Sequence, residues 1–515
     1  MSRKWSSSAS NSGSAPARGS GARRRARPSR LAVIATVLVL AVGAAALVIA
    51  QRMHASESVQ VPDAAVAPIP DVLGEEVAWQ QVIRYDDRDA ITGVTAGAAG
   101  PIIVTTHGAS GLDSATGEQT WSYTRPDSLV RIGNPCDSKT GLDGLPEPYD
   151  DASCYAVLTP DRSRLVLGYD ADQGLLLVVL DTTTGEAVFE HTHTYGGGEG
   201  RNTGARKRSY VHVTDRVLMV GEKVLSLDDG SPLATVPTSA LPDVGLTNDC
   251  PRDDVELCER LEGPSSGGHA TLILGLACWR PDHDYDKNST WCEVQIAPDD
   301  DPTAIQTVAG VVPAEYGGPE AIEGWIVRYA DPDAAYAELS QSSREGTEPA
   351  EEAAGRGLPL EAVDLDSVSG SRPAETVPLD GLGGTVRSYR IRHPYRVLTA
   401  EGNPEETEQA AEAYIVPSAD EAYTGEELAG QTSGAAYLET LNVHRSKDEG
   451  VSVVRPDGEV VLHLDDYPAA TDWLPTSGSG YVLRAPGVVA VVDQHAAVEQ
   501  ATGDASYELI ITALR

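Results

Sequence analysis

Beyond about residue 72, the hydrophobic positions of the chain fall in short runs separated by clusters of Gly, Asp and Pro. The clearest runs are 102–106, 165–169, 175–180, 217–220, 271–276, 451–454, 460–464, 488–492 and 507–513. Each is rich in aliphatic and β-branched residues and has the length of a strand. Only 333–340 and 405–414 have a pattern compatible with a turn or two of helix. The pattern predicts an all-β domain over residues 72–515.

The N-terminal part of the chain has a different pattern. Residues 31–50 are apolar and carry no charge, which matches the about 20 residues of one transmembrane helix. Residues 1–30 are basic and rich in Ser, Gly, Ala and Pro, a composition typical of a disordered tail. Because arginines cluster directly before the apolar run, we expect the tail to be cytoplasmic and the domain after the Pro- and Ala-rich linker 51–71 to be extracytoplasmic.

The predicted topology is therefore that of a single-pass protein of the cell membrane. The alternative is a cleaved signal peptide, whose apolar region usually spans only about 7–15 residues. Small residues at 44–46 would offer a cleavage site for that alternative.

The charge of the chain argues against one class of partner. The sequence holds 77 acidic and 39 basic residues, a formal net charge of -38. Such a surface repels a phosphate backbone, so we expect no nucleic-acid partner.

All the cysteines lie beyond the apolar segment, and their number is even. An even number in an oxidising compartment indicates disulfides, and no CxxC pair suggests a zinc site. Many pairings are open, but proximity along the chain favours three local bridges. These bridges join Cys136 with Cys154, Cys250 with Cys258, and Cys278 with Cys292.

Two segments of the domain repeat one another. Residues 111–121 read GLDSATGEQTW and residues 179–189 read VLDTTTGEAVF, with weaker copies at 227–230 and 365–370. In such a turn Asp caps the backbone and Gly takes a positive φ, so that the returning strand can pack its aromatic side chain on a neighbouring unit. The repeated positions are Asp113, Gly117 and Trp121 in the first copy, and Asp181, Gly185 and Phe189 in the second.

These positions resemble the tryptophan-docking repeats of pyrroloquinoline-quinone-type (quinoprotein-like) β-propellers. The resemblance implies a propeller of about seven blades, with eight as the alternative. We expect 78–83 to complete the last blade beside 507–513, which would leave no open sheet edge. The family includes dehydrogenases and noncatalytic envelope assembly proteins. Here no two cysteines are adjacent and the quinone and calcium ligands of the enzymes match no positions, so we expect no pyrroloquinoline quinone.

One loop has the spacing of a calcium site. Alternate oxygen-bearing side chains follow the pattern of an EF-hand loop, in which carboxylates converge on one cation. A lysine stands where that pattern needs glycine, and strands rather than helices flank the loop, so a solvated acidic loop is the alternative. The predicted ligands are Asp282, Asp284, Asp286, Asn288, Thr290 and Glu293.

His191 and His193 would share one face of a strand, a spacing that permits metal binding but is more typical of an inert pair. The sequence thus predicts a membrane-anchored, extracytoplasmic propeller that serves as a binding or assembly module for an envelope protein or glycan. The alternative is an extracytoplasmic enzyme, a quinoprotein dehydrogenase or a glycoside-active one, that uses a propeller pocket.

Overall fold

The computed structural model divides the chain into two compact units, residues 1–55 and 56–515, and all the residues it describes belong to the second unit. The described residues are 57–60, 67–85, 90–133, 155–171, 174–194, 211–236, 245–248, 250–252, 255, 257–261, 267–279, 291–312, 324–344, 358–371, 376–378, 388–392, 397–401, 412–416, 421–424, 438, 441–446, 450–455, 458–464, 480–498 and 505–515. The predicted membrane segment 31–50 lies outside them. Within the described residues, no helix has the length and apolar character needed to cross a bilayer.

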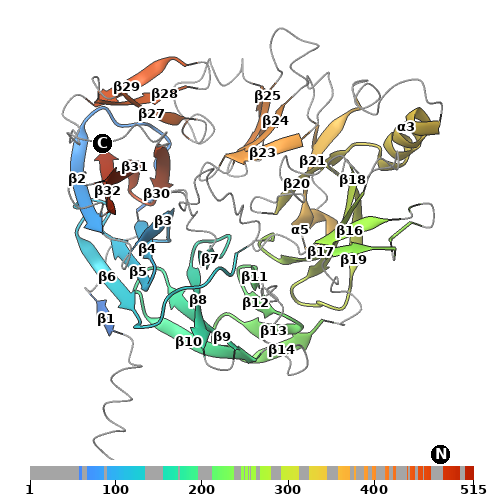
Figure 1. The fold of residues 1–515 in the computed structure, drawn as a ribbon, viewed down its shortest axis with the longest axis horizontal. Helices are drawn as coiled ribbons and strands as arrows, with labels where there is room; N and C mark the ends of the chain where they lie inside the picture. The colour runs from blue at the N-terminus through green and yellow to red at the C-terminus, as the bar shows by residue number, and fades with distance from the viewer. Residues whose placement is uncertain are drawn as a thin grey trace, which may run out of the picture. The chain divides into compact units, whose positions relative to one another are not determined.

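The described part of the second unit is nearly all β (Figure 1). Its two labelled helices are α3 (Pro332–Arg344) and the short α5 (Leu365–Val368). Helix α3 covers the first of the two stretches in which the sequence allows helix. The second stretch ends in a strand, β25 (Glu412–Val416).

Three antiparallel sheets follow one another along the chain, and each contains a meander of four consecutive strands. The first sheet has the order β1 (Glu57–Gln60), β6 (Gln119–Thr124), β5 (Gly108–Leu112), β4 (Pro101–Thr105), β3 (Ile91–Ala96). The second has the order β10 (Ala187–Thr194), β9 (Gly174–Asp181), β8 (Arg164–Ala171), β7 (Ala156–Leu158). The third has the order β11 (Val211–Val213), β12 (Val217–Val220), β13 (Lys223–Ser226), β14 (Pro232–Thr235). A four-stranded antiparallel meander is the unit of a propeller blade.

The fourth sheet has eight strands, and the fifth has four. The fourth sheet runs in chain order through β15 (Gly245–Thr247), β16 (Cys258–Leu261), β17 (Thr271–Trp279), β18 (Trp291–Pro298), β19 (Gln306–Val311), β20 (Trp325–Tyr329), β21 (Leu360–Asp364) and β22 (Thr376–Pro378). A single register pair, Val311 with Arg328, joins β19 to β20. The fifth sheet consists of β23 (Ser388–Arg392), β24 (Val397–Glu401), β25 and β26 (Glu421–Thr424).

The closing sheet combines both ends of the unit. Its order is β2 (Val77–Tyr85), β32 (Ala505–Leu514), β31 (Val488–Val498), β30 (Gly480–Ala485), β27 (Asn442–Ser446), β28 (Gly450–Val454), β29 (Val460–Leu464). Strand β2 pairs with β32 along its length, so that Ile83 lies opposite Leu509. The pairing of 78–83 with 507–513 expected from the sequence is present.

The hydrophobic core lies between neighbouring sheets. One cluster joins Val94 and Ile103 of the first sheet to Leu483 and Ile511 of the closing sheet. Equivalent clusters join the first sheet to the second, the second to the third, and the third to the fourth. Side chains on the sheet faces therefore hold the succession of sheets together.

Two of the three expected cysteine pairs are at bonding distance. The Cα atoms of Cys250 and Cys258 are 5.7 Å apart, and those of Cys278 and Cys292, which are cross-strand partners on β17 and β18, are 4.2 Å apart. Cys136 and Cys154 lie outside the described residues.

Candidate functional site

The two strong sequence repeats form the same turn. Asp113 Oδ1 accepts hydrogen bonds from the backbone N–H groups of Ala115 and Thr116, at 2.9 and 2.8 Å. Asp181 Oδ1 does the same for the two residues at matching positions of its own turn, at 2.9 and 3.1 Å. In both turns the glycine four residues after the aspartate adopts a left-handed backbone, with φ of 73° at Gly117 and 70° at Gly185.

The aromatic residue that ends each repeat lies against a turn of the following sheet. The ring of Trp121, on β6 of the first sheet, lies against Gly185 of the second, and its Nε1 donates to the Thr182 carbonyl oxygen at 3.0 Å. The ring of Phe189, on β10 of the second sheet, lies against Gly230 of the third. A side chain on either glycine would overlap the ring that covers it.

The closing sheet contributes a further aromatic contact of this kind. Trp79 of β2 lies against Gly117, and its Nε1 donates to the Ser114 carbonyl oxygen at 2.9 Å. The sequence interpretation placed β2 in the closing sheet but gave Trp79 no role. The available signal was Asp71, which stands eight residues before Trp79 as Asp113 stands before Trp121 and Asp181 before Phe189.

The turn at 226–230 in the third sheet has the same backbone geometry as the turns of the two strong copies, but different residues form it. Gly230 has φ 71° and its N–H donates to the Ser226 carbonyl oxygen at 2.9 Å, four residues earlier, so Ser226 rather than Asp228 stands in the place of Asp113. The sequence interpretation treated this turn as shortened, whereas the structure shows the full spacing. The position eight residues after Ser226 is Ala234, so β14 has no aromatic ring in the position of Trp121.

Polar contacts join the third and fourth sheets where the aromatic is missing. The Asp215 carboxylate lies 2.7 Å from His269 Nδ1 and also accepts from the Asp161 backbone N–H of the second sheet, at 2.8 Å. Nearby, Arg216 forms an ion pair with the buried carboxylate of Asp299, which also accepts from Thr214 Oγ1 at 2.8 Å. One cluster of turns thus connects three sheets.

Asp366 and Gly370, the weak repeat copy at 365–370, behave differently from the strong copies. The Asp366 carboxylate accepts from the backbone N–H groups of His269 and Ala270, at 2.9 and 3.0 Å. A Cβ atom on Gly370 would meet no atom of the described residues within 4 Å, although its φ is 87°. This copy therefore binds the backbone of the 267–270 segment, and no aromatic ring of the described residues lies against Gly370.

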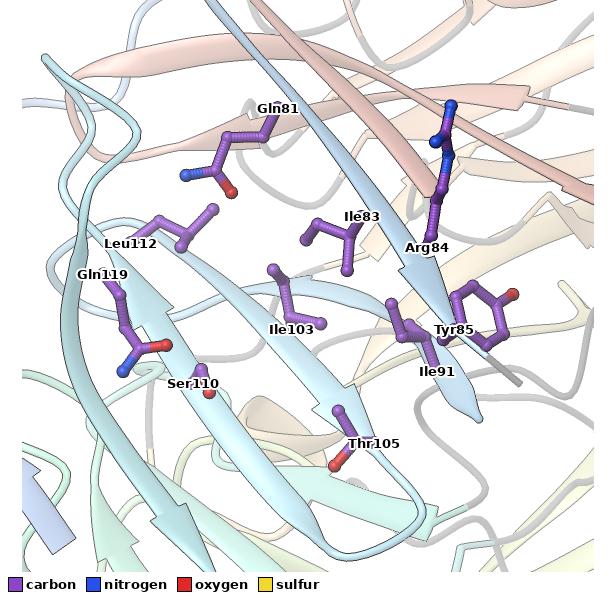
Figure 2. Close-up of a pocket in the computed structure, with 10 residues that line it drawn as sticks. All are labelled: Gln81, Ile83, Arg84, Tyr85, Ile91, Ile103, Thr105, Ser110, Leu112 and Gln119. Atoms are coloured by element: carbon purple, nitrogen blue, oxygen red, sulfur yellow. The ribbon is translucent and has the colours of Figure 1, made fainter. Parts of the chain in front are cut away.

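A pocket of about 530 Å³ lies between β2 of the closing sheet and the first sheet (Figure 2). This volume is within the range of small-molecule sites. The lining residues come from β2, β3, β4, β5 and β6; they are Gln81, Ile83, Arg84, Tyr85, Ile91, Ile103, Thr105, Ser110, Leu112 and Gln119. The pocket lies beside the Trp79 contact. Its lining residue Gln81 is two residues after Trp79 on β2.

The corresponding positions between the first and second sheets hold larger, buried side chains. By register, Gln81 corresponds to Tyr123, because each lies two residues after the docked tryptophan. Ser110 pairs with Ile103 as Val178 pairs with Leu167, so Ser110 and Thr105 correspond to Val178 and Tyr169. Tyr123 and Tyr169 are fully buried there. At these three positions the pocket has smaller side chains than the next interface, whereas Gln119 is larger than its counterpart Ala187.

The lining of the pocket is mixed in character. Figure 2 shows Ile83 near Ile103 and Leu112, and Ile83 packs on the core cluster that contains both of these residues. Arg84 points away, and its Nε forms a 2.5 Å ion pair with Glu508. The remaining polar groups are carboxamides and hydroxyls, which suit hydrogen bonding to a ligand rather than proton transfer.

Most of the predicted calcium loop lies outside the described residues, namely Asp282, Asp284, Asp286, Asn288 and Thr290. Glu293 is described, on β18, where burial raises the pKa of its carboxyl group. The described residues contain no group of three or more His, Cys, Asp or Glu side chains that could hold a metal ion.

His191 and His193 lie on β10, on the face that carries Phe189. Burial lowers the pKa of both imidazoles, and the charge of Lys223 lowers it further.

Comparisons with known proteins give distant likenesses only. No family model matches the chain, and no curated protein matches it in sequence. Among solved structures, the dihydro-heme d1 dehydrogenase NirN is 10% identical with a TM-score of 0.28, over 88% of this chain and 78% of that one. Kuenenia stuttgartiensis hydrazine synthase is 8% identical with a TM-score of 0.29, over 73% and 98%. A putative TolB from Agrobacterium tumefaciens is 10% identical with a TM-score of 0.24, over 62% and 91%. At these scores the likenesses carry no argument about function.

Proposed function

We propose that this chain is a membrane-anchored, extracytoplasmic β-propeller that serves as a binding or assembly module in the cell envelope. The observation that carries the binding role is the pocket between β2 and the first sheet, which is lined by side chains capable of hydrogen bonding and by an apolar wall. At the interface of the first and second sheets, the corresponding positions hold the buried side chains of Tyr123 and Tyr169.

The propeller assignment is supported by features of the described sheets. Four-stranded meanders follow one another, an aromatic ring of one sheet covers a turn of the next, and β2 pairs with β32. The pairing of β2 with β32 joins the two ends of the domain in one sheet, with β2 as its edge strand, as in a propeller closed by its N-terminal strand. We propose seven blades, with eight as the alternative.

The envelope location is supported by the apolar segment 31–50, by the arginines before it, and by the two cysteine pairs at bonding distance. Protease added to intact, wall-stripped cells should digest the chain after Arg52 and spare the N-terminal tail. An ectodomain that resists protease in intact cells and becomes sensitive only after lysis would refute this topology. A mature protein beginning near Ala55 in the medium would support the signal peptide instead.

The binding role is tested by a photoreactive amino acid placed at Gln119, an exposed residue that lines the pocket, and at Thr192, an exposed residue of the second sheet. Illumination of intact cells should give a defined adduct from position 119. The adduct should disappear when Thr105→Tyr and Ser110→Val fill the pocket. Equal adducts from positions 119 and 192, or none from 119, would contradict a binding site here.

An extracytoplasmic enzyme is the second candidate, and the contact between Asp215 and His269 favours it. A carboxylate on Nδ1 orients an imidazole for general base catalysis at Nε2, and the His269 side chain is 41% exposed. Full-length protein should then oxidise alcohols with an artificial electron acceptor or cleave chromogenic glycosides. Loss of that turnover in His269→Gln would support the enzyme, and turnover that His269→Gln leaves intact would remove His269 from it.

A further inference from the structure

The pocket between β2 and the first sheet has space for a six-membered ring. At the next interface the corresponding space holds the phenol rings of Tyr123 and Tyr169. Gln81 and Thr105 stand in their places and are shorter. A pyranose ring is similar in size to a phenol ring, so the pocket of about 530 Å³ accommodates a sugar unit with its substituents.

The polar groups of the pocket favour a sugar over an unsubstituted aromatic ring as the ligand. Gln81 uses its Nε2 to donate to the Gly117 carbonyl oxygen, which leaves Oε1 as an acceptor. Within the described part of the chain, the Ser110 hydroxyl and the Gln119 carboxamide make no hydrogen bond. An unsubstituted aromatic ring would desolvate these groups without replacing their hydrogen bonds to water, at a cost of about 1–3 kcal/mol each. Sugar hydroxyls donate and accept, and therefore match all three.

The charge of the site favours a neutral sugar over an acidic one as the ligand. Among the described residues that line the pocket, Arg84 is the one with a positive charge, and Figure 2 shows its side chain pointing away from the other lining residues. Its guanidinium is paired with Glu508, so it does not compensate a ligand anion. Ile83 and Ile103 form an apolar surface that suits the C–H face of a pyranose.

We propose that this pocket binds an uncharged pyranose unit, through Gln81, Ser110 and Gln119, with one face of the ring against Ile83 and Ile103. This inference rests on the proposed binding function and gives it a ligand class. The sugar could come from a free saccharide or from a glycan chain of the envelope, which share the same ring chemistry.

The test is saturation-transfer NMR and calorimetric titration of the full-length protein. The probes are methyl glycosides of neutral hexoses and N-acetylhexosamines, short oligosaccharides of the same units, a methyl glucuronide and phenol. Neutral glycosides should bind saturably, and the glucuronide and phenol should bind at least about tenfold more weakly. Tighter binding of the oligosaccharides than of the monosaccharides assigns the ligand to a glycan chain, and equal affinity assigns it to a free saccharide.

Three variants test whether the glycosides bind in the pocket or elsewhere on the surface. Thr105→Tyr with Ser110→Val copies the filled interface and should abolish saturable binding. Gln119→Leu, at an exposed position, should weaken binding about two- to tenfold, the range for one lost hydrogen bond. Thr192→Val on the second sheet should bind as the wild type does. Unfolding midpoints are measured alongside, and Gln119→Leu remains informative if the filled variant does not fold.

Saturable binding that the filled variant and Gln119→Leu retain would overturn the proposal, as would the absence of neutral-glycoside binding to the wild type. If glycosides fail to bind while the photoreactive residue at position 119 still captures a partner, the binding function stands and the sugar assignment is wrong. If both fail, the binding function itself is wrong.

Discussion

Trp121 and Gly185 belong to neighbouring sheets, and the indole ring occupies the space where a side chain on residue 185 would lie. A Cβ atom on Gly185 would lie 2.6 Å from Cδ2 of the indole, and the φ of this glycine is 70°. Glycine is therefore required at this position for two reasons, the left-handed backbone and the ring that covers it. The same pair of reasons holds for Gly117 under Trp79 and for Gly230 under Phe189.

Gly185→Ala should destabilise the protein more than Gly370→Ala does. Both glycines have positive φ, which costs an alanine about 1–2 kcal/mol. At Gly185 the overlap with the Trp121 ring should add about 1–3 kcal/mol of overpacking, whereas at Gly370 no described atom is within reach. Urea unfolding of the two variants measures the difference. Equal losses of unfolding free energy would show that the ring does not rest on Gly185.

Gly111 and Trp121 should be coupled in a double-mutant cycle. They are cross-strand partners, and a Cβ atom on Gly111 would overlap the indole, whereas the equivalent pair in the second sheet is Val179 and Phe189. Gly111→Val alone should cost about 2–4 kcal/mol through overpacking. Trp121→Phe, which removes the overlap, should recover at least half of that cost in the double variant. Additive losses would contradict the contact.

The repeats predicted the part of this architecture that is local in sequence. Asp113 and Gly117 are four residues apart, so their turn chemistry is visible in one segment of the chain. The pairing of β2 with β32 was inferred because an unpaired edge at either end of an all-β domain needs a partner. The two cysteine pairs followed from short separations.

The parts that the sequence did not predict depend on contacts between distant residues or on missing volume. Asp215 and His269 are 54 residues apart, and Asp366 and His269 are 97 apart, with no shared motif. The pocket depends on Thr105 and Ser110 being smaller than their counterparts in the second sheet. That comparison requires the strand register, which only the structure supplies.

Stability should fall as the pH is lowered from about 7 to about 5, in part through His191 and His193. Burial and Lys223 hold the pKa of both imidazoles below the ordinary value near 6.5, so the unfolded chain binds more protons in this window. The unfolding free energy therefore rises with pH there and levels off above about pH 7. Replacing both histidines by glutamine should flatten this slope in urea titrations at several pH values.

Glu293 should change the stability with pH in the opposite direction and therefore serves as a control. Burial raises the pKa of its carboxyl group, so the folded state keeps its proton longer than the unfolded chain does. Its contribution to stability is present at low pH and is lost as the pH rises through the folded pKa. Glu293→Gln should remove this loss and leave the histidine slope. A histidine variant with an unchanged slope between pH 5 and 7 would contradict the assignment.

Calcium should raise the melting temperature of the protein if the predicted loop from Asp282 to Glu293 is a binding site. A cation that binds only the folded state stabilises it by about 2.7 kcal/mol at a hundredfold excess over Kd, and extracellular sites of this kind bind at about 0.1–1 mM. Because Glu293 must lose its proton to act as a ligand, the rise should be larger at pH 7 than at pH 5. Asp284→Ala should abolish the rise and leave the metal-free protein folded. Sodium at matched ionic strength is the control, since a chain of net charge -38 is stabilised by any cation that screens it. If sodium reproduces the effect, or if Asp284→Ala still responds to calcium, these side chains form a solvated acidic loop.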